Sequence, residues 1–189
     1  MIIAYDLFGH DNLSFMWPNS VPANLERCPC DDLVLNNEKA VSSDFKIKKK
    51  LDVSYTYDGY LIVSERFKEF VQTEKITDVN FYGLPASPGY YLFTAKNILE
   101  FDALRRRVKF SKPCEVCNQS LEVIGSSPVC LKQNEVIKRG IFRSDVEFGE
   151  KNNKFPIIII GIDTHSKLMA SGMTGIDSHE ILDKYDWEK

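Results

Sequence analysis

The chain has 189 residues and a mass of 21.7 kDa, which is enough for one domain of ordinary size. Hydrophobic residues make up 43% and charged residues 27%, and this composition excludes a disordered chain, a collagen and a coiled coil. The net charge of −3 provides no basic field for a polyanion, so we expect no nucleic-acid partner. Because the apolar run from Phe155 to Ile162 is much shorter than the ~20 residues of a membrane helix, we expect no membrane partner either.

The segment from Met1 to Asp6 lacks the basic and apolar regions of a signal peptide, so we expect a cytoplasmic protein. The five cysteines are too few for a disulfide scaffold of this length, and their odd number leaves at least one outside any pair. In a reducing compartment, clustered thiols are more often metal ligands or redox groups than disulfides.

The first predicted unit is a strand, a helix and a second strand within residues 60–81. Tyr60 to Val63 is apolar and strand-like, and Ser64 stands where it can cap the helix that follows. Residues 76–81 alternate towards a strand. Three apolar residues recur at helical spacing between the two strands: Phe67, Phe70 and Val71.

The middle of the chain predicts a turn and two further strands. Residues 83–89 are rich in proline and glycine, and the aromatic segment from Tyr90 to Ala95 favours a strand. Residues 104–110 alternate between apolar and basic side chains, which predicts a strand with a solvated basic face. Three cations would lie on that face: Arg105, Arg107 and Lys109.

A second strand-helix-strand unit follows the first at an offset of 97 residues, with Ile157 to Ile160 in register with Tyr60 to Val63. Asp163 or Thr164 is the expected helix cap, and Leu168 and Met169 are expected to face inward. We expect Gly172 to end the helix in a left-handed conformation. Chance similarity of two such patterns is the alternative.

These units predict an α+β fold, with two related strand-helix-strand lobes on a mostly antiparallel β framework. We expect a single globular domain over residues 1–189. Within it, lobe one spans about residues 1–82, a cysteine-bearing connector about residues 83–130 and lobe two about residues 131–182. The connector is a candidate zinc-ribbon-like insert.

Two close cysteine pairs, Cys28 with Cys30 and Cys114 with Cys117, are far apart in the sequence. If the fold brings them together, four thiolates form a closed tetrahedral site for one structural Zn²⁺ ion, and Cys130 is left over. The alternatives are buried cysteines that act as small hydrophobic residues and exposed free thiols.

The residues that follow the cysteine pairs permit the tight turns of a zinc knuckle. Asp31 and Asn118 occupy positions where such turns usually need glycine at positive φ, and Asn and Asp are the next most tolerant residues. The first pair departs from the usual spacing, because a single residue, Pro29, separates its thiols.

The chain carries no recognisable constellation for catalysis, and we expect that it is not an enzyme. Its three histidines, His10, His165 and His179, lack the spacing of a helical zinc-protease motif. The glycine-containing segment 171–175 lacks the Lys-Ser/Thr end of a phosphate loop.

All of the net charge belongs to the last fourteen residues, 176–189, which carry five acids and two lysines. One interpretation is a solvated terminus. The other is a partner-binding surface, because aromatic residues rimmed by charge are typical of interface anchors. The candidate contact residues are Asp183, Tyr185, Asp186 and Trp187.

The order of these features resembles that of the double-CXXCG motif proteins and related immunity proteins of bacterial polymorphic-toxin systems. The resemblance covers residues 28–181, and its most specific pieces are residues 63–67 (VSERF), residues 141–149 (IFRSDVEFG) and the pair Cys114 and Cys117. It implies an immunity protein that binds a cognate toxin domain and neutralises it by forming a stoichiometric complex. The alternative function is a zinc-ribbon-containing adaptor or regulatory protein, and the oligomeric state is left open.

Overall fold

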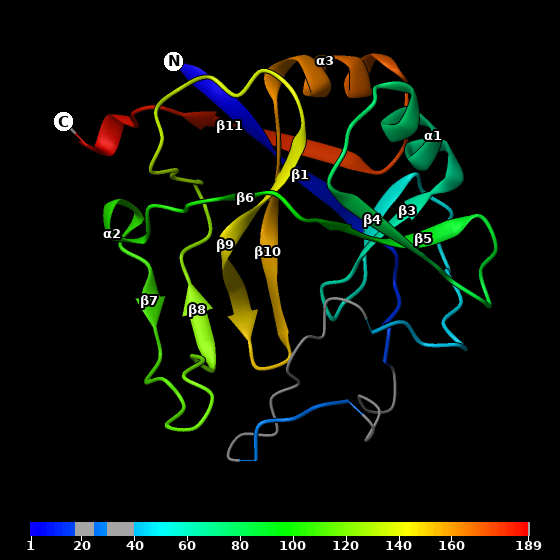
Figure 1. Cartoon of the computed structure of the whole chain (residues 1–189), viewed down its shortest axis with the longest axis horizontal. Helices are drawn as coiled ribbons and strands as arrows, with labels where there is room; N and C mark the ends of the chain where they lie inside the picture. Colours follow the sequence, from blue (N-terminus) through cyan, green and yellow to red (C-terminus); the bar gives the residue numbers. More distant parts are fainter. Residues whose placement is uncertain (18–24, 30–39, 189) are drawn as a thin grey trace.

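The computed structural model describes residues 1–17, 25–29 and 40–188. This part contains three α-helices and eleven strands in one continuous sheet (Figure 1). All but two of the strand pairings are antiparallel, so the predicted α+β class with a mostly antiparallel framework is confirmed. No helix among the described residues is both long and apolar enough to cross a membrane.

The elements follow one another along the chain as two strand-helix-strand units with a strand-rich segment between them. The helices are α1 (Glu65–Thr73), α2 (Ala103–Arg106) and α3 (Ile162–Ala170), and the 3-10 turn η2 (Asp186–Glu188) lies near the C-terminus. The strands are β1 (Ile2–Asp11), β2 (Val53–Tyr55), β3 (Leu61–Ser64), β4 (Val79–Gly83), β5 (Tyr90–Ala95), β6 (Ile98–Leu99), β7 (Lys109–Phe110), β8 (Glu122–Ile124), β9 (Ile141–Glu150), β10 (Asn153–Ile160) and β11 (Ile176–Leu182).

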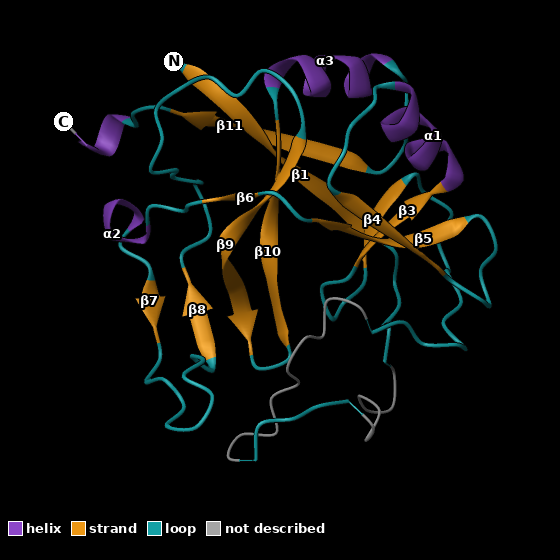
Figure 2. Ribbon diagram, viewed as in Figure 1, coloured by secondary structure: helices purple, strands orange, loops and turns teal. Residues whose placement is uncertain are grey.

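The long strand β1 connects the two halves of the sheet. It pairs with β11 along most of its length, with β10 at Tyr5–Leu7 and with β2 at His10–Asp11. The main path through the sheet is β4-β5-β3-β2-β1-β10-β9-β8-β7. Helices α1 and α3 lie along the same border of this sheet (Figure 2).

The predicted repeat corresponds to real elements. The bounds of α3 lie 97 residues after those of α1, and β11 begins 97 residues after β4. Ser64 caps α1 as expected, since its hydroxyl accepts a hydrogen bond from the Phe67 N–H, and Gly172 has a left-handed φ of 65° just after α3.

The apolar strands of both units are buried on both faces, which explains their unbroken hydrophobic sequences. Ile158 and Ile160 of β10 pack under the two helices with Phe67 and Leu168, whereas Ile159 packs into a second cluster on the other face. In β3, Ile62 likewise belongs to a third cluster, with Met16 and Tyr60 among its members. Burial of each such side chain contributes about 1.5–3 kcal/mol.

The predicted strand over residues 104–110 is wrong, because the chain turns there. The Asp102 carboxylate caps the short helix α2 by accepting a hydrogen bond from the Arg105 N–H at 2.9 Å. Arg107 then adopts a left-handed φ of 60°, and only Lys109–Phe110 forms a strand. The three cations therefore do not share one strand face.

The expected cap and inward face of the second helix are also corrected. Gly161 is the cap residue of α3, and the first amides of the helix bond to carbonyls of the loop before it, at Ile137 and Lys138. Thr164 instead accepts a hydrogen bond from the Gly140 N–H. Met169 is 47% exposed, so only Leu168 of the predicted pair is buried.

Candidate functional site: a cluster of three cysteines

Cys114 and Cys117 lie in the tight turn that joins β7 and β8. The Cys114 N–H donates to the Gln119 carbonyl, and the Asn118 N–H donates to the Cys114 carbonyl, both at 2.9 Å. Asn118 has a positive φ of 57°, as predicted for the residue after the second thiol. A bridge between Pro113 and Ser120 closes the base of the turn.

Cys28, from a segment 86 residues earlier, brings a third thiol to this turn. Its Sγ lies 3.5 Å from the Sγ of Cys114, and the three sulfur atoms of Cys28, Cys114 and Cys117 all lie within 4.8 Å of one another. Ligands about 2.3 Å from a tetrahedral zinc ion lie about 3.8 Å apart, whereas sulfur atoms in a disulfide are about 2.05 Å apart. The spacing therefore fits shared coordination of one ion.

The donor set is also chemically suited to a soft divalent metal. Cys28 and Cys114 are buried, Cys117 is half-buried, and Leu121 packs against the group. The Val116 N–H points at the Cys114 sulfur, 3.4 Å from it, and this contact favours the thiolate form. Three thiols in a largely enclosed site can hold a zinc ion, and a fourth ligand would complete its shell. Cys30, the predicted fourth ligand, lies outside the described residues.

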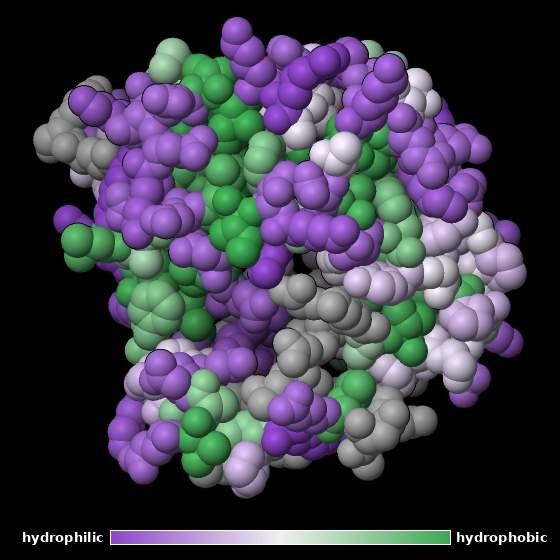
Figure 3. Space-filling model, in the orientation of Figure 1, coloured by the Kyte–Doolittle hydropathy of each residue, from purple (hydrophilic) through white to green (hydrophobic). Residues whose placement is uncertain are grey.

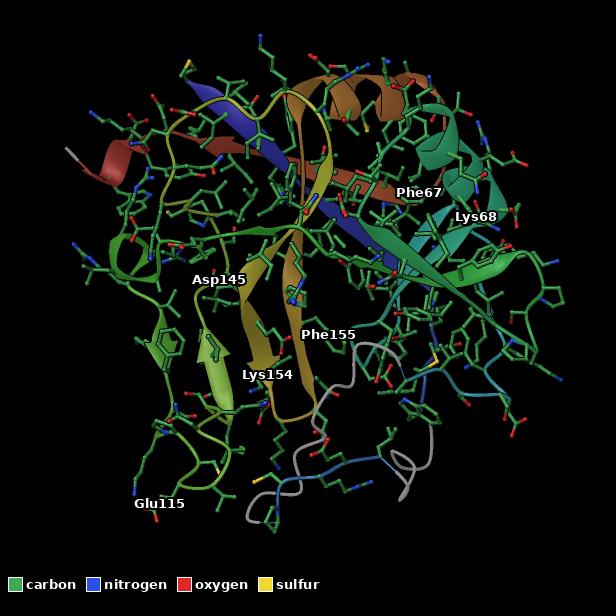
Figure 4. All side chains as sticks on the ribbon, viewed as in Figure 1. Phe67, Lys68, Glu115, Asp145, Lys154 and Phe155 are labelled. Carbon is green, nitrogen blue, oxygen red and sulfur yellow. The ribbon has the colours of Figure 1, made fainter. Side chains whose placement is uncertain are left out.

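Lys154, a buried lysine in β10, fastens the cysteine-bearing turn to the sheet. Its ammonium group donates to the Ser120 carbonyl at 2.5 Å, next to the residue that bonds the Cys114 amide. Figure 4 shows Lys154 at the lower end of β10, beside the hairpin whose turn carries Glu115. This contact orients the cysteine-bearing turn, and no sequence pattern predicted it. The only feature of the sequence that could have indicated this contact is a single lysine at the start of an otherwise apolar strand.

Cys130 is separate from the cluster, as its position in the sequence predicted. It is fully buried, and its thiol lies 3.7 Å from the Pro128 carbonyl.

The acidic C-terminal residues fold back onto the body of the protein. Asp183 forms an ion pair with the amino group of Met1 at 2.5 Å, and this hydrogen bond holds the pKa of Asp183 below its usual value. The Tyr185 hydroxyl donates to the Val129 carbonyl, and burial raises the pKa of this tyrosine. Trp187 stacks on Tyr185 and is 47% exposed. Among the four candidate contact residues, Asp183 and Tyr185 thus also hold the end of the chain in place.

The three histidines occupy β1, β11 and α3. His165 stacks on Tyr5 and bonds to the Ser178 hydroxyl at 2.8 Å, and burial lowers its pKa. His179 lies 3.1 Å from the buried carboxylate of Asp6. Burial raises the pKa of Asp6, although contacts with His179 partly oppose this rise. His10 pairs with Asp177 at 2.9 Å.

The carboxylate of Asp52, which no sequence pattern indicated, joins the two repeated units. It accepts hydrogen bonds from the Ser64 hydroxyl at 2.7 Å and from the Thr174 N–H at 2.8 Å. Arg66 lies 3.4 Å from the same carboxylate and also donates to the carbonyls of Ser171 and Gly172. The helix cap of one unit and the turn before β11 of the other therefore share one acid.

Comparison with models of known protein families finds none that matches this chain, and comparison with curated proteins finds no relative.

Proposed function

We propose that this chain is an immunity protein that neutralises a bacterial toxin domain by stoichiometric binding, and that its cysteine cluster holds one structural Zn²⁺ ion. The observation that carries the metal proposal is the convergence of Cys28, Cys114 and Cys117 from two distant segments. Cys30 is the proposed fourth ligand. A site closed by four thiolates leaves no position for a reactive water, so the ion would stabilise the fold and perform no chemistry.

The resemblance carries the antitoxin proposal, and the positions of its most specific segments support it. Residues 63–67 form the end of β3 and the start of α1, where Ser64 caps the helix and Arg66 reaches the second unit. Residues 141–149 lie in β9, where the Asp145 carboxylate accepts a hydrogen bond from the Phe101 N–H at 2.7 Å. Residues with such structural roles are those that proteins of one fold would share.

Metal analysis tests the zinc proposal directly. Protein purified without added metal should contain about one equivalent of zinc, and Cys114→Ser should lose it. Cys130→Ser is the matched control, because Cys130 is buried elsewhere, and it should keep the metal. A zinc content of less than about half an equivalent in the unaltered protein would contradict the four-cysteine site.

Co-expression tests the antitoxin proposal. The protein should restore growth to cells that express the toxin domain encoded directly upstream of its gene, and the two proteins should co-purify in equal amounts. Phe67→Asp, which places a charge at a fully buried position, is the control for loss of fold. The cysteine cluster also favours a second function, that of an adaptor or regulatory protein. For such a protein we expect neither rescue nor a toxin gene upstream.

A further inference from the structure

Strand β4 ends the main path through the sheet, and one of its edges has no partner strand among the described residues. The Leu84 N–H donates to the Tyr90 carbonyl, and the Lys96 N–H donates to the Asp78 carbonyl, so even-numbered positions face β5. Backbone groups alternate between the two sides of an antiparallel strand. The N–H and C=O groups of Val79, Phe81 and Gly83 therefore point outward from the sheet.

This edge lacks the features that usually discourage strand addition. Its sequence, Val-Asn-Phe-Tyr-Gly, contains no charge and no proline, and its pairing with β5 contains no bulge. The other terminal strands of the described part differ, because β6 and β7 have only two residues each and β11 carries Asp177 and Glu180. At five residues, β4 is long enough to pair with an extended segment.

A cationic groove of about 550 Å³ opens at the N-terminal end of β4. Its lining includes residues 73–77 together with Arg139 and Lys167. Among the lining residues that the structure describes, Glu74 is the one carboxylate, and it contacts Lys167 at 2.5 Å and Arg139 at 3.8 Å. Lys75, Arg139 and Lys167 thus provide three positive charges against one negative charge in the lining. A second acid, Asp78, lies next to the groove, where its carboxylate accepts hydrogen bonds from Thr77 and Asn97. Figure 3 shows hydrophilic residues gathered over α1 and α3, which border the groove.

We propose that the open edge of β4 docks an extended segment of a protein partner as an added antiparallel strand. In an antiparallel addition, the C-terminal end of the incoming segment lies beside the N-terminal end of β4. That end therefore reaches the groove, where a carboxylate meets Lys75, Arg139 and Lys167. The identity of the partner as a toxin rests on the proposed function, whereas the recognition of an extended, acid-ended segment rests on the edge and the groove.

A peptide tests this recognition without the natural partner. The probe is a seven-residue peptide of alternating threonine and valine that ends in two aspartates, titrated to millimolar concentration into isotopically labelled protein. Amide resonances of Val79, Phe81 and Gly83 should shift more than those of Asn80 and Tyr82, because only the odd-numbered amides face the added strand. Replacing the two aspartates with lysines should weaken binding about fivefold or more, because attractive contacts with the groove cations become repulsive.

Two variants separate the edge from the groove. Gly83→Pro removes an outward N–H while leaving the bonds to β5, and a Cβ at this position meets no atom within 4 Å. It should weaken binding of both peptides. Arg139→Gln should reduce the difference between the aspartate and lysine peptides, and Lys109→Gln on β7 is the matched control that should leave it unchanged.

The inference is overturned if no resonance of residues 79–83 shifts at millimolar peptide, or if the aspartate and lysine peptides bind equally well. The titrations with the two peptides use the unaltered protein and require no toxin. Rescue of toxin-expressing cells without peptide binding would leave the antitoxin proposal standing and remove this docking edge. Peptide binding without rescue would support the docking edge and contradict the antitoxin proposal.

Discussion

Replacement of Asp52 by asparagine tests whether one carboxylate holds the two repeated units together. Asparagine keeps the shape of the side chain and can still accept one hydrogen bond, but it removes the negative charge. The Ser64 hydroxyl bonds Oδ1 and the Thr174 N–H bonds Oδ2, so in asparagine an amide nitrogen replaces the acceptor of one of them, and Arg66 loses its ionic partner.

The size of the effect follows from the number and kind of these contacts. A hydrogen bond to a charged group contributes about 1.5–3 kcal/mol, and the exposed ion pair with Arg66 contributes less than about 1 kcal/mol. Because asparagine preserves part of the bonding and Thr174 is exposed to water, we expect Asp52→Asn to lower the free energy of unfolding by about 2 kcal/mol. For a chain of this length, the melting temperature should fall by about 4–8 °C.

The pH dependence provides a second, independent signature. Burial acts to raise the pKa of Asp52, but hydrogen bonds from Thr174 and Ser64 and the charge of Arg66 outweigh it and hold the pKa below the ordinary value of 3.8. A carboxyl with a depressed folded-state pKa stabilises the protein above its unfolded-state pKa, and this stability is lost as the pH falls through the folded-state value. The difference between wild type and Asp52→Asn should therefore be constant near neutral pH and shrink below about pH 4.

Urea unfolding followed by circular dichroism, repeated from pH 7 to pH 3, measures both effects. Ser64→Ala and the double variant complete a thermodynamic cycle, which should give a coupling energy of about 0.5–2 kcal/mol between the two side chains. Stability of Asp52→Asn within about 0.3 kcal/mol of wild type at pH 7 would refute the reasoning.

Three further predictions concern packing, backbone and charge. Leu168→Ala should cost about 2–5 kcal/mol in chemical unfolding, whereas Met169→Ala on the same helix should cost less than about 0.5 kcal/mol; equal losses would contradict their assigned burial. Gly175→Ala should destabilise by about 2 kcal/mol or more, because φ is 78° and the new Cβ would lie 2.3 Å from the Val53 carbonyl oxygen; an unchanged melting temperature would refute this. Burial raises the pKa of Asp6, so ionisation of this carboxyl lowers the stability of the wild-type protein as the pH rises, and Asp6→Asn should lessen that loss. A free energy of unfolding that declines more steeply in Asp6→Asn than in wild type from pH 4 to pH 8 would contradict this.

Local patterns in the sequence were sufficient to predict the two repeated units. Their strands are continuous apolar runs, and Ser64 satisfies the first amides of α1 with its own side chain, so the helix start is encoded locally. The start of α3 is not encoded in this way. Its amides bond to carbonyls of the preceding loop, and Gly161 allows that loop to approach, because a Cβ there would lie 2.6 Å from the Arg139 nitrogen. A tertiary contact thus replaced the cap that Asp163 or Thr164 was expected to supply.

The candidate metal site was predictable in part for a similar reason. The spacing of Cys114 and Cys117 and the tolerance of Asn118 for positive φ are local properties, and the turn has the expected form. The approach of Cys28 and the support from Lys154 depend on how distant segments pack, and no periodicity or spacing reports that. The strand expected over residues 104–110 failed because Asp102, just outside the pattern, supplied a helix cap.

The most recognisable segments of this chain and its proposed docking edge occupy different places. Residues 63–67 and 141–149 lie in elements that hold the fold, through Ser64 as a cap and through Asp145 as an acceptor for the Phe101 amide. Changes there cost stability whatever the partner is. Strand β4 would contribute its outward backbone groups irrespective of side-chain identity, while its Val79 and Phe81 side chains pack against the core. Selection of a partner would then depend on the groove cations Lys75, Arg139 and Lys167 rather than on the residues that maintain the fold.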